Sequence, residues 1–462
     1  MIPSMDLPRR DEGEIAVIGL ARSGRAVAKL LRKNGYSIYA SDSATTGEVA
    51  ASVEELTSLG ITAQTGGHDR DRLSAARLVV VSPGVPPNAP PLAIARENGI
   101  PVVSEVEAAL RFLPASRIIA VTGTNGKTTT TAIIAHILRA ISGDAVEAGN
   151  IGTALSEVAL SEKHPSWIAL EMSSFQLHDT NSLEPLVGVL TNLSPDHLDR
   201  YASVEEYYAD KARLFTSAEP GSRWVVNADD ALVREMVAGV AGEHYSFSLE
   251  REAEAFFDPG VGKLVLLGQA LMERARFPLL GRHNVANALA ASLAVAVADP
   301  AHRTAESRQL IAAALETFRP LPHRLELVGE FAGVQWINDS KATNVSSTTV
   351  AVDGMERPTV LLLGGRHKGE AYSPLAEGIR RKVKKVIAYG EAAPVIERDL
   401  AQNVSLEVLG ADFDEVVAAA RSAARAGDAI LLSPACSSYD MFANYEERGD
   451  RFRALAAEGG RR

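Results

Sequence analysis

The sequence is poor in several features that would define a class of protein. Its 462 residues include a single cysteine, Cys436, which excludes an intramolecular disulfide and a cysteine-rich metal site and fits a reducing compartment. No apolar run approaches the roughly 18 residues that span a bilayer. The first residues are charged and have no apolar core, so we expect neither membrane insertion nor a secretory signal. We therefore expect a cytoplasmic protein.

The sequence also contains fewer basic than acidic residues. The 47 Lys and Arg stand against 58 Asp and Glu, giving a formal net charge of −11. Because binding to a phosphate backbone needs clustered Lys and Arg, nucleic acid is not expected as a partner. The length, together with ordinary hydrophobic and charged fractions, predicts about three globular domains.

What the sequence does have is a phosphate-binding loop between an apolar, strand-like run and a helical stretch. Gly123 and Gly126 allow the backbone N–H groups to face one point, Lys127 would reach the outer phosphates of a nucleoside triphosphate, and Thr128 would contact Mg²⁺. Val121 stands where the strict motif has its first glycine, so this is a P-loop variant. The alternative is an ordinary strand-to-helix loop with a surface lysine. The predicted cradle comprises Gly123, Thr124, Asn125, Gly126, Lys127, Thr128 and Thr129.

The segment before this loop predicts a second nucleotide-like site. Residues 14–105 alternate short apolar runs with helical stretches, a βαβ pattern typical of a parallel sheet. The turn from Gly19 to Gly24, followed by Asp42 at a strand end, imitates a dinucleotide-binding fingerprint. Ala21 puts a methyl group where the second glycine admits a pyrophosphate, so NAD is not favoured. A nucleotide-like ligand is the preferred interpretation, and a purely structural glycine turn is the alternative.

The middle of the chain supplies candidate metal ligands. Glu171 ends an apolar strand-like run, which places it at the sheet edge where P-loop proteins bind Mg²⁺. Residues 196–201 crowd two acids, His197 and an arginine, although a solvated loop has the same composition. Lys211 follows a capping box and, taken alone, is a surface lysine. Residues 244–280 are expected to add antiparallel strands.

These patterns predict an α/β protein of three domains. Residues 1–106 would form a Rossmann-like domain, and 107–319 a P-loop ATPase-like domain with a parallel sheet and a small antiparallel sheet. Residues 320–462 would form a second Rossmann-like α/β domain. Basic residues on loops of the last domain suggest ATP held between domains, in a transferase or ligase rather than a motor or switch.

Seven segments, in order along the chain, resemble the Mur ligase family: 123–129, 170–177, 196–201, 283–288, 321–324, 337–344 and 432–440. The match runs from about residue 15 to 456. It implies a peptide-bond-forming ligase in which ATP phosphorylates UDP-N-acetylmuramoyl-L-alanine and D-glutamate attacks the acyl phosphate, a cytoplasmic step of peptidoglycan precursor synthesis. Two Mg²⁺ ions and a monomer are expected with it.

The resemblance also assigns residues to roles. Catalysis is implied for Lys127, Glu171, His197 and a carbamylated Lys211, with Mg²⁺ bound by Thr128, Glu171 and His197. Further ATP contacts are implied for Asn284, Asn287, Arg324, Asp339 and Lys341. The UDP substrate would contact Arg22, Ser23, Asp42, Ser43, Gly84, Asn150, Ser173 and Gln176. The glutamate pocket would comprise Thr343, Lys368, Ser438, Tyr439 and Tyr445.

Two departures from the family pattern and several rival functions remain. Ala21 and Arg22 replace a glycine and an apolar residue, and Tyr445 stands where phenylalanine is common. The rivals are a related ligase that uses L-glutamate, a folate-polyglutamate-type ligase, a diamino-acid ligase, a non-catalytic ATP-binding scaffold and a nicotinamide-dependent dehydrogenase. The Rossmann-like first segment counts against the folate type, and the missing Asp-Asn-Pro-Arg loop counts against the diamino-acid ligase.

Overall fold

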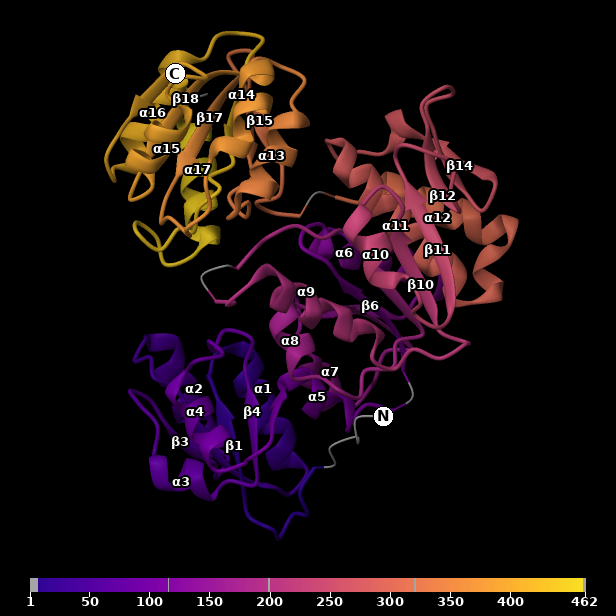
Figure 1. Cartoon of the computed structure of the whole chain (residues 1–462), viewed down its shortest axis with the longest axis vertical. Coiled ribbons are helices and arrows are strands. Elements are labelled where there is room, and N and C mark those ends of the chain that lie inside the picture. The colour runs from indigo at the N-terminus through magenta and orange to yellow at the C-terminus, as the bar shows by residue number, and fades with distance from the viewer. Residues whose placement is uncertain (1–6, 115, 198–199, 320, 460–462) are drawn as a thin grey trace. The chain divides into compact units, whose positions relative to one another are not determined.

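The computed structural model describes residues 7–114, 116–197, 200–319 and 321–459 (Figure 1). The chain forms two compact units. One contains Met1–Leu193, Ser203–Arg274 and Asn287–Leu315, and the other contains Ser194–Ala202, Ala275–Ala286 and Glu316–Arg462. Three sheets with flanking helices confirm the predicted three α/β domains. None of the helices in the described ranges is long and apolar enough to cross a membrane.

The N-terminal sheet is wholly parallel, with strand order β3-β2-β1-β4-β5. Alternate residues of β1 point to opposite faces: Ile15 and Val17 pack among residues of α1 and α2, whereas Ala16 and Ile18 pack among residues of α3 and α4. The three-residue strand β3, which the sequence pattern did not predict, is an edge strand. The elements are β1 (Glu14–Ile18), α1 (Arg22–Lys33), β2 (Ser37–Ser41), α2 (Gly47–Ser58), β3 (Thr62–Gln64), α3 (Arg70–Ala75), β4 (Leu78–Val81), α4 (Pro90–Glu97), β5 (Val102–Ser104) and α5 (Glu105–Leu110).

The central sheet has nine strands in the order β14-β13-β12-β11-β10-β9-β6-β8-β7. Its strands are β6 (Arg117–Thr122), β7 (Ala145–Gly149), β8 (Trp167–Glu171), β9 (Val187–Leu190), β10 (Arg223–Asn227), β11 (Glu243–Ser248), β12 (Ala255–Asp258), β13 (Lys263–Leu266) and β14 (Gln269–Glu273). Its helices are α6 (Lys127–Ser142), α7 (Leu155–Leu160), α8 (Ser174–His178), α9 (Val204–Ala212), α10 (Ala231–Val237), α11 (Arg282–Ala298) and α12 (Ala305–Thr317).

The antiparallel strands expected between residues 244 and 280 differ from the prediction in one respect. They do not form a small sheet of their own, because β11 pairs in parallel with β10, and β12 with β11. Only the β12–β13 and β13–β14 pairs are antiparallel. Pairing of β11 with the open edge satisfies the backbone groups of β10. The strands β11 to β14 therefore extend the main sheet.

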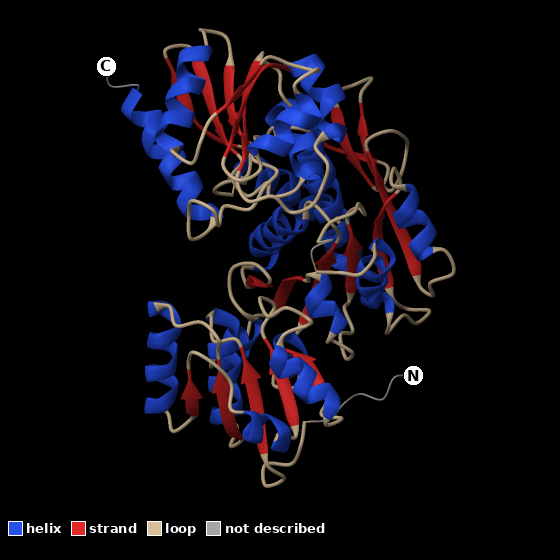
Figure 2. Cartoon of the chain, turned by 60° about the vertical axis from the view of Figure 1, so that its left-hand side comes forward, coloured by secondary structure: helices blue, strands red, loops and turns tan. Residues whose placement is uncertain are grey.

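The C-terminal sheet is parallel except for β15, which pairs with β16 in antiparallel fashion. Figure 2 shows helices flanking the strands of this domain. Its strand order is β15-β16-β20-β17-β18-β19. Leu361 and Leu363 on β17 pack with α13, α14 and α15, while Val360 and Leu362 pack with α16 and α17. The elements are β15 (Glu326–Phe331), β16 (Val334–Asn338), α13 (Val345–Asp353), β17 (Thr359–Gly364), α14 (Ala376–Lys382), β18 (Val383–Tyr389), α15 (Ala393–Leu400), β19 (Leu406–Val408), α16 (Phe413–Ala423), β20 (Ala429–Leu432) and α17 (Tyr445–Gly459).

Candidate active site

The predicted UDP-substrate residues of the first domain lie where the strand order reverses, between β1 and β4. Arg22 and Ser23 begin α1 directly after β1, Gly84 follows β4, and Asp42 and Ser43 follow β2. Crevices at such a switch point are the usual ligand sites of open parallel sheets. The two oxygens of Asp42 accept hydrogen bonds from the backbone N–H groups of Leu20 and Ala44, at 2.7 and 2.8 Å. The carboxylate therefore holds the β1 and β2 loops together.

The glycine turn of this domain also has a packing role. A Cβ atom at Gly24 would lie 1.7 Å from the carbonyl oxygen of Gly19, so α1 can approach β1 only with glycine there. His68, which the sequence reading missed, lies beside the same loops, with its Nδ1 atom 2.8 Å from Ser41 Oγ. A lone histidine in a loop carries no local signal, and only pairing of the strands brings it there.

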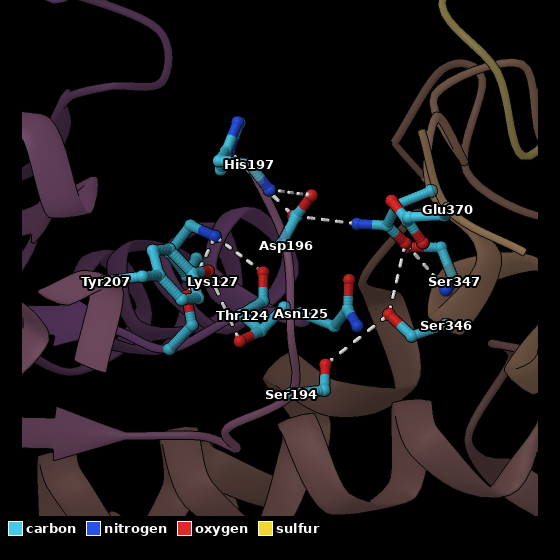
Figure 3. A network of polar contacts seen from close by, with 12 residues as sticks. Thr124, Asn125, Lys127, Ser194, Asp196, His197, Tyr207, Ser346, Ser347 and Glu370 are labelled. Atoms are coloured by element: carbon cyan, nitrogen blue, oxygen red, sulfur yellow. Dashed lines mark hydrogen bonds and ion pairs between the residues drawn. The ribbon is translucent and has the colours of Figure 1, made fainter. Parts of the chain in front are cut away.

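The P-loop lies between β6 and α6, as predicted. Gly123 and Gly126 have φ angles of 141° and 82°, in the region that favours glycine. The Lys127 ammonium folds back onto the loop and donates to the carbonyl oxygens of Gly123 and Thr124, at 2.9 and 2.7 Å (Figure 3). Asn287, from α11, lies against the loop, because a Cβ at Gly126 would be 2.4 Å from its Oδ1 atom.

Glu171 is placed beside the P-loop by strand pairing, since it lies opposite Val121 in the parallel β6–β8 register. Its side chain is buried, and Oε1 accepts a hydrogen bond of 2.9 Å from Asn150 Nδ2. Oε2 is also buried and has no hydrogen-bond partner among the described residues. A buried carboxylate oxygen left in this state is costly unless it binds a cation.

Taken alone, the sequence around Lys211 indicated a surface lysine. This interpretation is wrong, because Lys211 is only 1% exposed. Its Nζ atom donates to the carbonyl oxygen of Gly123 at 2.6 Å and lies 4.5 Å from the ring centre of Tyr207. The preceding residue, Asp210, is bonded to His178 on α8, with 2.7 Å between Oδ1 and Nδ1. This bond raises the pKa of His178 above its usual value.

Ser173 and Gln176, assigned to the muramoyl-alanine path, form a capping box at the start of α8. The Ser173 hydroxyl donates to Gln176 Oε1 at 2.8 Å, and the backbone N–H of Gln176 donates to Ser173 Oγ at 3.2 Å. Both residues thus have a structural role in beginning the helix. Gln176 Nε2 is buried without a hydrogen-bond partner in the described chain.

The segment with Asp196 and His197 belongs to the second unit. Asp196 is 6% exposed, and its Oδ2 accepts a hydrogen bond of 2.8 Å from Asn344 Nδ2 (Figure 3). His197 has a φ of 56°, and its backbone N–H donates to Asp196 Oδ1 at 2.9 Å. The alternative interpretation, a solvated loop, is therefore wrong for Asp196. The next two positions of the motif, 198 and 199, lie outside the described residues.

The remaining predicted ATP residues also belong to the second unit. Asn284 Nδ2 donates to the carbonyl oxygen of Leu280 at 2.7 Å. Asp339 accepts hydrogen bonds from the Leu325 N–H (3.2 Å) and the Ser433 hydroxyl (2.8 Å). Burial raises the pKa of Asp339 to about 7. Arg324 and Lys341 lie on the loops before β15 and after β16.

The predicted glutamate residues lie on loops after three neighbouring strands, together with the first residue of α17. Thr343 follows β16, Ser438 and Tyr439 follow β20, and Lys368 follows β17. The carboxyl ends of these parallel strands meet at one edge, so the loops lie close together. Tyr445 begins α17, with the Lys341 ammonium 5.1 Å from its ring centre.

The described residues can hold ATP and Mg²⁺. The glycine cradle, Lys127 and the buried Glu171 Oε2 provide the cation and oxygen ligand that a Mg²⁺–triphosphate needs. Across the described ranges, no three His, Cys, Asp or Glu side chains converge on one point. Mg²⁺ commonly takes one or two carboxylates together with substrate phosphates and water.

Comparison with known families covers most of the chain. Residues 13–104 match the Mur ligase MurD-like N-terminal domain, 121–295 match the Mur ligase middle domain, and 323–436 match the Mur ligase glutamate ligase domain. This ATP-dependent, three-domain chain belongs to the Mur ligase family.

Individual proteins agree with the assignment. The UDP-N-acetylmuramoylalanine–D-glutamate ligase of Anaeromyxobacter dehalogenans is 40% identical over 99% of this chain and 100% of its own length. The protein of the same name from Cytophaga hutchinsonii is 37% identical over 96% of this chain and 99% of its own. The UDP-N-acetylmuramate-alanine ligase MurC of Thermotoga maritima shares the fold, with a TM-score of 0.62 at 18% identity, covering 96% of this chain and 99% of that structure.

Proposed function

We propose that this chain joins D-glutamate to UDP-N-acetylmuramoyl-L-alanine with cleavage of ATP to ADP and phosphate, a step of peptidoglycan precursor synthesis. The observation that carries the proposal is the 40% identity, over both full lengths, to a protein named as a UDP-N-acetylmuramoylalanine–D-glutamate ligase. Lys127, Glu171, His197 and Lys211, the residues on which the chemistry depends, are all present. We further propose a cytoplasmic monomer, with domains at 1–106, 107–319 and 320–462.

The P-loop residues have a direct role in this reaction. The backbone N–H groups of 123–129 and the Lys127 ammonium would hold the β- and γ-phosphates while the γ-phosphoryl group passes to the alanine carboxylate. Lys127 must first leave the carbonyl oxygens of Gly123 and Thr124, to which it is bonded at 2.9 and 2.7 Å. The amine of D-glutamate would then attack the acyl phosphate, and phosphate would leave.

Mg²⁺ would be held by Thr128 and Glu171, with His197 on a second ion, and would neutralise the charge of the transferring phosphoryl group. Asn150 donates a hydrogen bond to one Glu171 oxygen and would thereby orient the other oxygen toward the metal ion. Carbamylation of Lys211 would convert its ammonium into an N–H group that carries a carboxylate. That N–H could keep donating to Gly123, because one donor is enough for the 2.6 Å contact.

The pocket of the last domain would bind D-glutamate. Lys368 would pair with a substrate carboxylate, while Thr343, Ser438, Tyr439 and Tyr445 would surround the rest of the amino acid. Tyr439 is 63% exposed, so a large apolar ring is available for contact with a substrate.

The test is phosphate release with ATP, Mg²⁺ and UDP-N-acetylmuramoyl-L-alanine, comparing D-glutamate, L-glutamate and a diamino acid. Turnover with D-glutamate alone supports the proposal. Turnover with L-glutamate alone keeps the ligase mechanism and overturns the substrate. If no acceptor supports turnover despite ATP binding, the chain is a scaffold.

A further inference from the structure

The loops that carry the proposed amino-acid site share a buried contact that none of the predicted residues explains. They follow the adjacent strands β16, β20 and β17 and contain residues 339–344, 433–442 and 365–372. Loops at a strand edge are mobile unless something fixes them. A single side chain, Arg448, forms hydrogen bonds with the first two loops and lies beside the third.

Arg448 enters this region from α17 and is 0% exposed. Its Nε donates to Ser340 Oγ at 3.0 Å, and one Nη donates to the carbonyl oxygens of Ser340 and Cys436 at 2.8 and 3.1 Å. The other Nη donates to the carbonyl oxygen of Ser437 at 3.4 Å. A Cβ atom at Gly365, on the third loop, would lie 3.1 Å from this last nitrogen.

The hydrogen bonds of Arg448 depend on the shape of its guanidinium group. In the described part of the chain Arg448 makes no ion pair, so its buried charge is compensated by hydroxyl and carbonyl oxygens alone. Burying a charge is costly unless it is well hydrogen-bonded. The guanidinium spreads its donors over three nitrogens in one plane, a geometry that a lysine ammonium, with all its donors on one atom, does not reproduce. The contacts therefore constrain where the two loops lie with respect to each other.

A second contact links the same loop to the helix. The Ser340 hydroxyl, which accepts from Arg448, donates to the carbonyl oxygen of Tyr445 at 2.8 Å. Tyr445, one turn before Arg448 on α17, is itself a predicted glutamate contact. Arg448 and Ser340 together thus connect both loops and the start of the helix.

We propose that Arg448 is a positioning residue for the amino-acid site. It holds Thr343 on one loop, and Ser438 and Tyr439 on the other, in one fixed arrangement before the substrate binds. The inference rests on the proposed D-glutamate site and deepens it, because it names the residue that preorganises the site without touching the substrate.

A purely structural role makes a different prediction. If Arg448 only stabilised the domain, its loss would lower the melting temperature and leave the KM of the folded enzyme for D-glutamate unchanged. A positioning role predicts that the KM for D-glutamate rises while the KM values for ATP and the UDP substrate change little.

The experiment compares Arg448→Lys and Arg448→Met with Phe452→Leu in the full-length enzyme. Phe452 is the matched control, because it lies on the same helix, is 0% exposed and carries no hydrogen-bonding side-chain group, with its ring centre 5.6 Å from that of Trp336. We expect the KM for D-glutamate to rise about tenfold or more in the Arg448 variants, with the other KM values within about threefold. Phe452→Leu should lower the melting temperature only.

Three further measurements keep the test decisive. Ser340→Ala removes one acceptor of Arg448 and should fold even where Arg448→Met does not, with a smaller rise in the same KM. Ethylguanidinium added to Arg448→Ala should lower the KM for D-glutamate. Hydroxylamine trapping of the acyl phosphate without any amino acid should remain as in the wild type.

The outcomes separate the two proposals. An unchanged KM for D-glutamate in Arg448→Lys and Ser340→Ala overturns the positioning role. A wild-type enzyme that traps an acyl phosphate but does not use D-glutamate overturns the proposed substrate instead.

Discussion

Two glycines flank α6, and they have different surroundings. Substitution is therefore expected to affect ATP binding at one of them and the stability of the fold at the other. Gly126 precedes the helix with φ 82°, and Gly143 follows it with φ 73°. A Cβ at Gly126 would lie 2.4 Å from Asn287 Oδ1, whereas a Cβ at Gly143 would meet nothing within 4 Å. Both positions strain an L-residue, but only the first closes the phosphate cradle.

The first prediction concerns this pair. Gly126→Ala should weaken ATP binding about tenfold or more, because Asn287 must move or the loop must change shape. Gly143→Ala should cost about 1 kcal/mol of stability and leave ATP affinity unchanged. Calorimetric titration with ATP and thermal melting measure the two effects. Equal ATP affinity in both variants would contradict the assignment of the cradle.

The second prediction concerns Glu171, whose buried Oε2 has no hydrogen-bond partner in the described chain. Glu171→Gln should lower kcat by about 100-fold or more, because a preorganised metal ligand is lost. Its melting temperature should stay the same or rise, because a buried charge is removed. Glu147→Gln, on the neighbouring strand β7, is the control and should keep its activity. Full activity of Glu171→Gln would exclude the magnesium role.

At the scale of elements, a pair of helices holds Lys211 in place. His178 on α8 bonds Asp210 on α9 at 2.7 Å. Asp179 and Arg213 also face His178, and Arg213 Nε donates to the carbonyl oxygen of Leu177 at 2.9 Å. The helix that carries Lys211 is therefore attached to the helix that follows Glu171, so both of the side chains proposed to be catalytic depend on one packing arrangement.

The third prediction is a pH dependence of this contact. The hydrogen bond to Asp210 raises the pKa of His178 above its usual 6.5. The pair therefore stabilises the fold below pH 6.5, and the stabilisation is lost as pH rises through the higher folded-state pKa. The melting temperature of His178→Gln should fall below that of the wild type by more at pH 5.5 than at pH 8.5.

His244→Gln is the control for this series, because the His244 ring bonds the backbone carbonyl of Val240 rather than a carboxylate. Its difference from the wild type should vary less with pH. A His178→Gln deficit that grows with pH would show that the ion pair does not stabilise α8 against α9.

At the scale of the whole molecule, two neighbouring acids on α5, at the proposed junction of the first two domains, bond segments of the central domain. Glu107 accepts hydrogen bonds from the backbone N–H groups of Asn181 and Ser182, at 2.8 and 2.9 Å, and pairs with Arg111. Glu105 is 0% exposed, and its Oε1 accepts from the Ser156 N–H at 2.6 Å, while Oε2 has no partner in the described ranges. Both carboxylate oxygens of Glu107 thus have polar partners, whereas only one oxygen of Glu105 has one among the described residues.

The fourth prediction follows from this contrast. Burial raises the pKa of Glu105 from 4.5 to about 7. Because the folded state holds a proton that the unfolded chain loses, Glu105 makes the fold less stable as pH rises from 4.5 to 7. Glu105→Gln should therefore melt above the wild type at pH 8 and show a smaller gain at pH 5. Glu107→Gln should melt lower at both. A Glu105→Gln variant less stable than the wild type at pH 8 would contradict this account.

The sequence by itself determined the fold class, the glycine loop between β6 and α6, and the family. A strand, a glycine turn and a helix are contiguous, so residues 117–129 already contain the information for an anion site. Glu171 could likewise be predicted, because a residue that ends a buried parallel strand lies at the carboxyl edge of the sheet.

Only the tertiary structure decided the contacts between remote segments. Lys211 is buried because α9 packs on the P-loop, Asp196 pairs with Asn344, and Arg448 reaches Ser340 across 108 residues of sequence. The strands after β10 extend the central sheet because an open edge was available to them. No local pattern encodes such contacts, since each depends on where the packed cores place two distant pieces of backbone.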